Sequence, residues 1–153
     1  LQAEIVPELR GFLPVRREVS VANARMDMLL ENAQGRRCYV EVKNATAVDE
    51  HGSAIFPDAV SARAGRHLRE LAALAAQGHR AVIFFCVQRG DARCLSPADA
   101  IDPGYGQTLR TVLPQGVEAL AWQADVRLEQ IVLRRALPVV IPDIAFTPTE
   151  HMT

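Results

Sequence analysis

The spacing of hydrophobic residues along the chain predicts a fold in which strands and helices alternate. Within residues 59–77, leucines recur at helical spacing, which predicts one long helix. Residues 80–88 hold an almost unbroken hydrophobic run, which is typical of a central strand that is parallel to a neighbour. The predicted strands cover residues 15–21, 25–31, 37–43, 80–88, 117–124 and 131–133, and the predicted helices cover residues 1–9, 59–77 and 106–113. This order predicts an α/β fold with a mixed β-sheet flanked by helices.

Short connections separate the first three predicted strands, so these strands are expected to form an antiparallel meander. Residues 22–24 and 32–35 supply the two turns. Further along the chain, we expect residues 44–58 to form a loop and a turn to begin at Ser96 and Pro97.

The chain is predicted to be one domain with a short tail. At 153 residues it is long enough for one ordinary domain and too short for two. Residues 1–136 are assigned to the domain, and residues 137–153, where prolines recur, to an extended tail. Because the chain starts at Leu1 rather than Met, inside a predicted helix, we expect it to be part of a longer protein.

The composition excludes several classes of protein. Hydrophobic residues make up 49% and charged residues 23%, which is typical of a globular domain and not of a disordered chain. The longest hydrophobic run, residues 81–87, is far shorter than the roughly 18 residues of a membrane span, so no membrane association is expected. The formal net charge of −1 argues against a basic protein that coats nucleic acid. The 3 cysteines, without a Cys-x-x-Cys pair, favour a reducing, cytoplasmic location.

A single lysine stands out among the basic residues. Of 17 such residues, all except Lys43 are arginines. Arginine is a planar cation that stays charged, whereas lysine carries a compact ammonium that can release a proton. This usage indicates that position 43 requires an ammonium group.

Two carboxylates are predicted to meet this lysine on neighbouring strands. Side chains alternate between the two faces of a strand, which places four on one face of the second strand: Arg25, Asp27, Leu29 and Glu31. On the third strand, Tyr39, Glu41 and Lys43 share a face. The hairpin therefore brings Asp27 close to Glu41 and Lys43.

This arrangement predicts a metal site with a catalytic lysine. Two close carboxylates need a cation between them, and oxygen ligands suit Mg²⁺ or Mn²⁺. Asp27, Glu41 and the carbonyl of Val42 are the candidate ligands. Such a metal activates water and neutralises charge on a phosphate, while Lys43 orients the water, lowers its pKa or stabilises the transition state.

Five segments, in this order along the chain, resemble the sugar fermentation stimulation protein A (SfsA) family: residues 25–30, 38–43, 56–60, 65–71 and 78–85. The resemblance extends over residues 8–140 and includes the D…ExK pattern of the PD-(D/E)xK nucleases. It implies a restriction-endonuclease-like fold, DNA binding and a link to the regulation of sugar genes, especially those of maltose utilisation. It also implies an N-terminal OB-like domain that this chain lacks, and a further acidic ligand on the first helix, for which Glu4 or Glu8 is a candidate.

The predicted function is therefore a Mg²⁺- or Mn²⁺-dependent nuclease that hydrolyses phosphodiester bonds of DNA, or alternatively of RNA. Asp27, Glu41 and Lys43 are its predicted catalytic residues. The alternative is a regulatory protein that binds DNA and keeps the nuclease fold without catalysis. A homodimer is a further candidate arrangement, since many enzymes of the superfamily dimerise to cut both strands.

Several other residues are candidates for contacts with nucleic acid: Arg25, Arg63 and His67. Each has a structural alternative, which is a salt bridge for Arg25 and a solvated helix face for the other two. Glu18 is either a further ligand or the ionic partner of Arg25. Asp58 is a site candidate whose alternative role is the N-cap of the long helix. Gln88, at the end of the central strand, could reach the active face.

Overall fold

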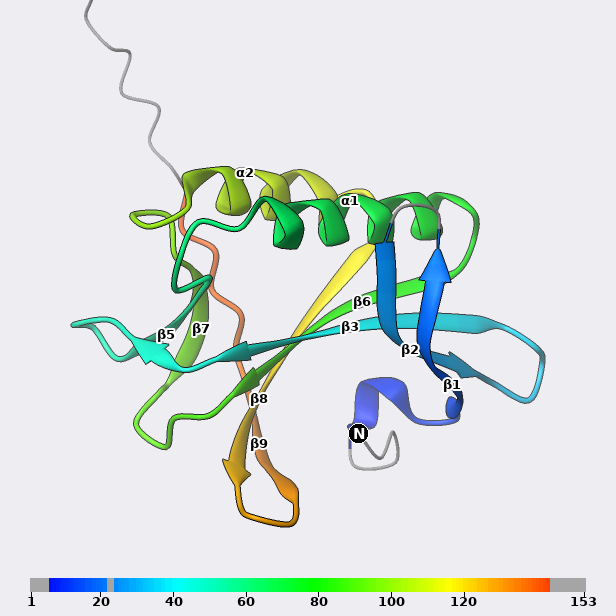
Figure 1. The fold of residues 1–153 in the computed structure, drawn as a ribbon, viewed down its shortest axis with the longest axis horizontal. Helices are drawn as coiled ribbons and strands as arrows, with labels where there is room; N and C mark the ends of the chain where they lie inside the picture. Colours follow the sequence, from blue (N-terminus) through cyan, green and yellow to red (C-terminus); the bar gives the residue numbers. More distant parts are fainter. Residues whose placement is uncertain (1–5, 22–23, 144–153) are drawn as a thin grey trace, which may run out of the picture.

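A computed structural model describes residues 6–21 and 24–143, which form a six-stranded mixed sheet with two helices on one face (Figure 1). The large sheet has the order β1-β2-β3-β6-β8-β9, and a small sheet has the order β4-β5-β7. The large sheet consists of β1 (Leu13–Val21), β2 (Ala24–Glu31), β3 (Arg37–Ala45), β6 (Arg80–Val87), β8 (Val117–Val126) and β9 (Ile131–Leu137). The small sheet consists of β4 (Ala47–Val48), β5 (Ser53–Phe56) and β7 (Cys94–Pro97), and the helices are η1 (Pro7–Leu9), α1 (Ala62–Ala76) and α2 (Pro103–Val112).

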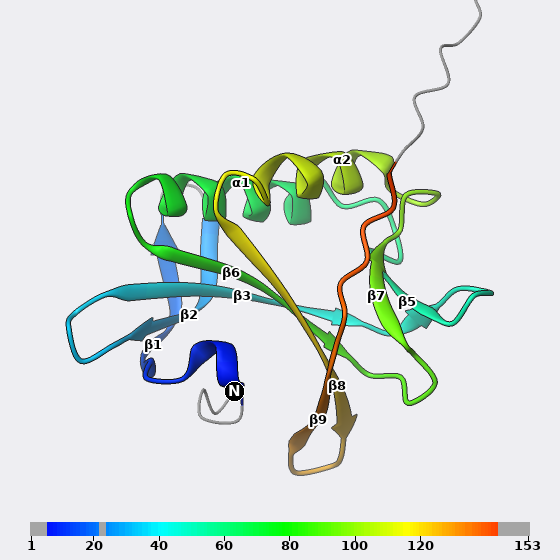
Figure 2. The same ribbon diagram turned by 180° about the vertical axis from the view of Figure 1, so that it is seen from behind.

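The topology confirms the predicted meander and the predicted central strand. β1, β2 and β3 pair antiparallel, while β6 lies between β3 and β8 and is parallel to both. The crossover connection through α1 joins β3 to β6, and the connection through α2 joins β6 to β8, so both add the next strand on the same side. Because such crossovers are right-handed, both helices lie on the same face (Figures 1 and 2). None of the described helices is long and hydrophobic enough to cross a membrane.

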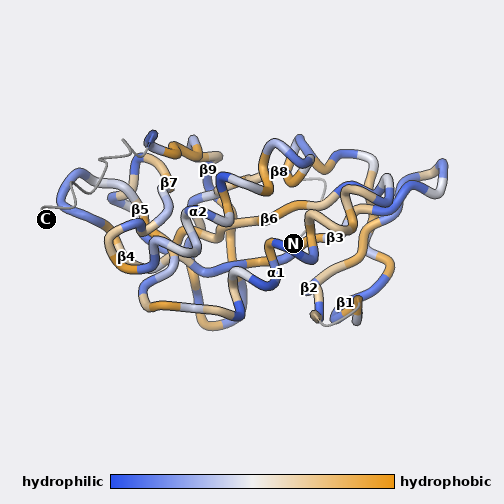
Figure 3. Tube along the Cα trace, turned by 90° about the horizontal axis from the view of Figure 1, so that it is seen from above, coloured by the Kyte–Doolittle hydropathy of each residue, from blue (hydrophilic) through white to orange (hydrophobic). Residues whose placement is uncertain are grey.

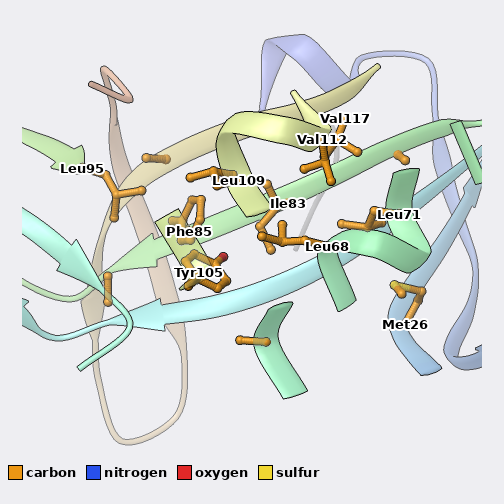
Figure 4. Packing of buried hydrophobic residues seen from close by; sticks show 14 of the residues in the cluster. Met26, Leu68, Leu71, Ile83, Phe85, Leu95, Tyr105, Leu109, Val112 and Val117 are labelled. Carbon is orange, nitrogen blue, oxygen red and sulfur yellow. The ribbon is translucent and has the colours of Figure 1, made fainter. Parts of the chain in front are cut away.

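Hydrophobic side chains form a core on each face of the large sheet. On the helix face, Leu68 of α1 and Leu109 of α2 pack with Ile83 of β6 (Figure 4). On the other face, Phe84 of β6 packs with Leu9 of η1. β6 supplies side chains to both cores, which explains its continuous hydrophobic run (Figure 3).

The small sheet was not predicted. Residues 44–58, expected as a loop, contain β4 and β5, and the turn expected at residues 96–97 lies within β7. β5 pairs parallel with β7 across about 40 intervening residues. Such a pairing depends on contacts between distant segments and leaves little signal in short strands.

Both long helices begin at different residues from those predicted. α1 begins after Ser61, whose hydroxyl accepts a hydrogen bond from the amide of Ala64 at 3.0 Å, so Asp58 is not the N-cap. Asp102 caps α2 through the amide of Tyr105, at 3.0 Å, and also accepts the amide of Ser61 at 2.8 Å. One buried carboxylate, that of Asp102, therefore joins the starts of both helices. This tertiary contact favours Ser61 over Asp58 as the N-cap of α1.

The ends of the chain also differ from the prediction in their described parts. Of the helix expected at residues 1–9, the structure shows only the short 3-10 helix Pro7–Leu9, and residues 1–5 lie outside the described residues. At the other end, β9 continues to Leu137, and Val139 bridges to Leu95. The division of the chain at residue 136 stays a prediction.

Replacing the carboxylate that joins the helices should destabilise the domain. Asp102→Ala removes a helix cap and leaves the amide of Ser61 without its acceptor, so we expect the free energy of unfolding to fall by about 2 kcal/mol. Urea denaturation measures this change. Asp58→Ala is the matched control, since Asp58 is exposed, and should change the value by less than about 0.5 kcal/mol. Equal losses in the two variants would contradict the assignment of the cap.

Candidate active site

The pairing between β2 and β3 stops next to Asp27, the first of the two predicted carboxylates. The last paired residues are Met28 and Val40. Beyond this pair, a side chain replaces the backbone as the hydrogen-bond acceptor: Asp27 Oδ2 accepts from the amide of Val42 at 2.7 Å. The carboxylate thus satisfies a backbone donor where the neighbouring strand leaves the ladder. This contact fixes Asp27 beside the strand that carries Glu41 and Lys43.

The alternation of side chains along β2 breaks at the same place. Met26 and Leu29 both lie in the core on the helix face, whereas Met28 lies in the core on the other face. The predicted single face shared by Arg25, Asp27, Leu29 and Glu31 is therefore wrong. On β1, Glu18 lies opposite this break, between the paired residues Arg17 and Val19, and has a φ of 54°. This left-handed backbone is uncommon for a residue other than glycine, and it allows both strands to bend at Asp27.

Glu41 is the most deeply buried charged side chain of the candidate site. It is only 3% exposed and projects from β3 toward α1. Its Oε1 lies 3.0 Å from Nζ of Lys43, which is two residues further along the same face of the strand. Burial raises the pKa of Glu41, the charge of Lys43 opposes this rise, and the charge of Asp27 adds to it. Glu41 and Lys43 are therefore in contact, and Asp27 is near enough to act on the Glu41 carboxylate electrostatically.

His67 of α1 completes this buried cluster. Its Nδ1 lies 3.0 Å from Lys43 Nζ and 3.0 Å from Glu41 Oε1. One ring nitrogen cannot accept a hydrogen bond from the first group and donate to the second at the same time. Burial lowers the pKa of His67 to about 4, and the charges of Lys43 and Arg63 act in the same direction. The ring is therefore neutral near pH 7 and forms no ion pair with Glu41. Because the Lys43 ammonium can only donate, we assign the tautomer in which Nδ1 accepts from it.

The second oxygen of Glu41 makes the site suitable for a metal ion. Glu41 Oε2 is buried and has no partner in hydrogen-bond geometry among the described residues, although the backbone amide of Asp27 is near enough to lower the pKa of this carboxylate. Buried carboxylate oxygens usually have a donor or a cation, and a divalent cation shared with Asp27 would satisfy this one. The described residues contain no group of three or more His, Cys, Asp or Glu side chains placed to hold a metal. Two carboxylates with a backbone carbonyl and water still suit Mg²⁺, which keeps several of its waters.

Tyr105 of α2 was not identified from the sequence. Its hydroxyl is buried without a described hydrogen-bond partner. Burial raises the pKa of Tyr105, and the charges of Glu41 and Asp102 raise it further. The predicted helix began at residue 106, directly after Tyr105, so Tyr105 was not assigned to it. The signal that could have revealed it is the Asp102-Pro103 pair, an N-cap followed by proline in the first turn.

The remaining candidates lie around the cluster or away from it. Arg25 and Glu18 are exposed, and the structure places them as a long ion pair, with 3.9 Å between Nη1 and Oε2. Arg63 is exposed on the first turn of α1, near enough to affect His67 electrostatically. Asp58 is exposed, and no described hydrogen bond or ion pair joins it or the Gln88 side chain to the cluster. His67, a candidate either for a contact with nucleic acid or for a solvated helix face, is only 4% exposed and contacts Lys43.

Comparisons with known proteins identify similar sequences and similar structures. The family model described as "Sugar fermentation stimulation protein RE domain" matches residues 1–130. Sugar fermentation stimulation protein homologs of Pelobacter propionicus and Citrifermentans bemidjiense are 55% and 52% identical over 137 residues, 89% of this chain. The matched regions are 59% and 58% of those two proteins, so the chain spans less than two thirds of their length.

One similar structure is that of Pyrococcus furiosus SfsA in complex with Ca²⁺. It has a TM-score of 0.82 and 35% sequence identity, and the match covers 90% of this chain and 59% of that one. Together with the strand order described above, these findings confirm the predicted restriction-endonuclease-like α/β class.

The neutral state of His67 predicts how stability depends on pH. The unfolded chain binds a proton at this residue near pH 6.5, whereas the folded protein resists protonation until about pH 4. Stability should therefore fall as the pH decreases from 6.5 to 4, by up to about 3 kcal/mol from this residue. Urea denaturation without divalent metal measures this slope.

His67→Gln should flatten that pH dependence, because glutamine does not titrate. His51→Gln is the control, since the side chain of His51 is 79% exposed. Parallel profiles for the wild-type protein and His67→Gln would show that His67 is not held neutral.

Proposed function

Since this chain belongs to the sugar fermentation stimulation protein (SfsA) family, we propose that it is the nuclease domain of a protein that hydrolyses phosphodiester bonds. The proposed substrate is DNA, with RNA as the alternative, and the proposed cofactor is Mg²⁺ or Mn²⁺. The proposal extends to a cytoplasmic location, a role in regulating sugar-utilisation genes and a homodimer that cuts both strands.

The unpartnered oxygen of Glu41 carries the proposal. A purely structural ion pair would engage the carboxylate through Lys43 and leave its other oxygen in solvent. Here that oxygen is buried and has no hydrogen-bond partner among the described residues, and its residue lies two positions from Lys43 and close to Asp27, where the pairing of β2 with β3 stops. The complex of Pyrococcus furiosus SfsA with Ca²⁺ supports a divalent cation in the family.

Asp27, Glu41 and the carbonyl of Val42 would hold the metal. When bound, the metal supplies positive charge that lowers the pKa of water and stabilises a phosphate under attack. The hydrogen bond from the Val42 amide keeps Asp27 in place. Glu41 is held by Lys43, which itself donates to His67, so the ammonium is oriented from two sides.

Lys43 has the second role in the proposed reaction. Its side chain is 15% exposed, so it is sheltered by the cluster and still in part accessible to solvent. From this position it can orient the attacking water and stabilise negative charge on the phosphate. A guanidinium is larger and planar, and it could not occupy the space between Glu41 and His67 in the same way.

Exposed arginines would bring the nucleic acid to the site. Arg63 and Arg66 lie on the first turns of α1 and affect the pKa of His67 electrostatically, so they are close to the cluster. Arg25 is exposed on β2, two residues from Asp27. Cations placed around a phosphodiester site contribute affinity that does not depend on sequence.

The alternative function is regulation by DNA binding without cleavage. It explains the exposed arginines equally well. It does not explain a buried carboxylate beside a second one, because two negative charges repel the phosphate backbone when no metal is bound. We therefore favour catalysis.

Cleavage assays with variants of Lys43 test the proposal. Because the curated relatives are longer than the matched region, the polypeptide is used at its natural length with labelled single-stranded, duplex and branched DNA, and with RNA, in Mg²⁺ or Mn²⁺. Both Lys43→Ala and Lys43→Arg should lower the cleavage rate by about 100-fold or more.

Arg37→Ala is the matched control, since Arg37 is an exposed cation at the other end of the same strand. It should retain the wild-type rate. Tight binding with no metal-dependent cleavage of any substrate would favour the regulator, and wild-type activity in Lys43→Ala would exclude the proposed role of Lys43.

A further inference from the structure

A cavity opens next to the candidate active site on the face of the sheet that the helices do not cover. Its volume is about 530 Å³, within the range of pockets that bind small organic groups. Its apolar floor is formed by side chains of the core on that face, among them Met28, Phe84 and Cys86. Its outer wall is the β8–β9 hairpin, which projects away from the helices (Figure 1).

The cavity and the candidate active site share two residues. Asp27 and Val42 line the cavity, and the same two residues form the hydrogen bond that positions the candidate metal ligand. Glu41 and Lys43 lie on the helix side of β3, and the cavity lies on the opposite side. A ligand whose phosphate occupied the Asp27–Glu41 site would therefore have its adjoining group at the mouth of the cavity.

The lining of the cavity does not suit a phosphate group. No arginine, lysine or histidine is among the described residues that line it, and its one charged residue is Asp27. Burial raises the pKa of Cys86, so this thiol stays neutral. The other polar groups are the amides of Asn44 and Gln130. The site thus suits a neutral group that both donates and accepts hydrogen bonds.

We infer that this cavity takes one unpaired nucleobase from the strand whose phosphodiester lies at Asp27 and Glu41. Side-chain amides form paired hydrogen bonds with the edges of bases, and apolar side chains hold the faces of a base that has left its stack. This inference rests on the proposed function and defines its substrate as a strand with at least one unpaired base near the cleaved bond. A base inside a continuous duplex is stacked and paired, so it could not enter.

Binding measurements with matched variants test the inference. The probes are labelled oligothymidylate and a strand of equal length built only of abasic units, measured by fluorescence anisotropy in Ca²⁺ at the natural length of the polypeptide. Ile131→Trp should fill the cavity from its exposed hairpin position, and Gln130→Ala should remove one amide. Each should weaken the binding of oligothymidylate by about tenfold.

Neither variant should change the binding of the abasic strand. The controls are Val126→Trp and Gln115→Ala. Val126 pairs with Ile131 in the hairpin and is similarly exposed but does not line the cavity, and Gln115 lines a separate cavity between α1 and α2. Both controls should bind oligothymidylate like the wild-type protein.

Three results would overturn the inference. One is an equal effect of Ile131→Trp on both strands, a second is no effect on either strand, and the third is thymidine monophosphate binding as tightly as the oligonucleotide. None of these results depends on cleavage. The binding measurements therefore test the base site, and the cleavage assays test the proposed activity, so either can fail while the other holds.

Discussion

The burial of the Glu41 carboxylate between β3 and α1 is the constraint on which the site depends. A buried charge is costly unless a partner lies within hydrogen-bond distance. Lys43 supplies that partner at 3.0 Å from the same face of the strand, and neutral His67 receives another hydrogen bond from the ammonium. One oxygen of Glu41 still has no described partner. A cation shared with Asp27 would complete the arrangement, so the energetics of the fold and the proposed chemistry depend on the same atoms.

The break in side-chain alternation at Asp27 places the candidate site next to features on both faces of the sheet. On the helix face lies the cluster of Glu41, Lys43 and His67, and on the other face lies the cavity beneath the β8–β9 hairpin. The left-handed backbone of Glu18 lies opposite Asp27, at the point where the side chains of β2 change the face on which they lie.

The strands and the central members of the site could be predicted because local rules decide them. The continuous hydrophobic run of β6 and the Glu-x-Lys spacing of β3 each carry their information within a few residues. The start of α1 at Ser61 could not be predicted, since Asp102, 41 positions away, selects it. The same is true of the role of His67, which sequence alone left open between a phosphate contact and a solvated helix face. Its burial against Lys43 comes from the packing of α1 on β3.

A calorimetric titration with Mn²⁺ tests the central claim most directly, because it measures the metal site without requiring catalysis. The account predicts that the wild-type protein binds Mn²⁺ and that Asp27→Asn and Glu41→Gln each weaken this binding at least tenfold. The control Asp58→Asn, at an exposed position, should bind like the wild-type protein. Unchanged affinity in both Asp27→Asn and Glu41→Gln would contradict the account, because the metal would then lie elsewhere.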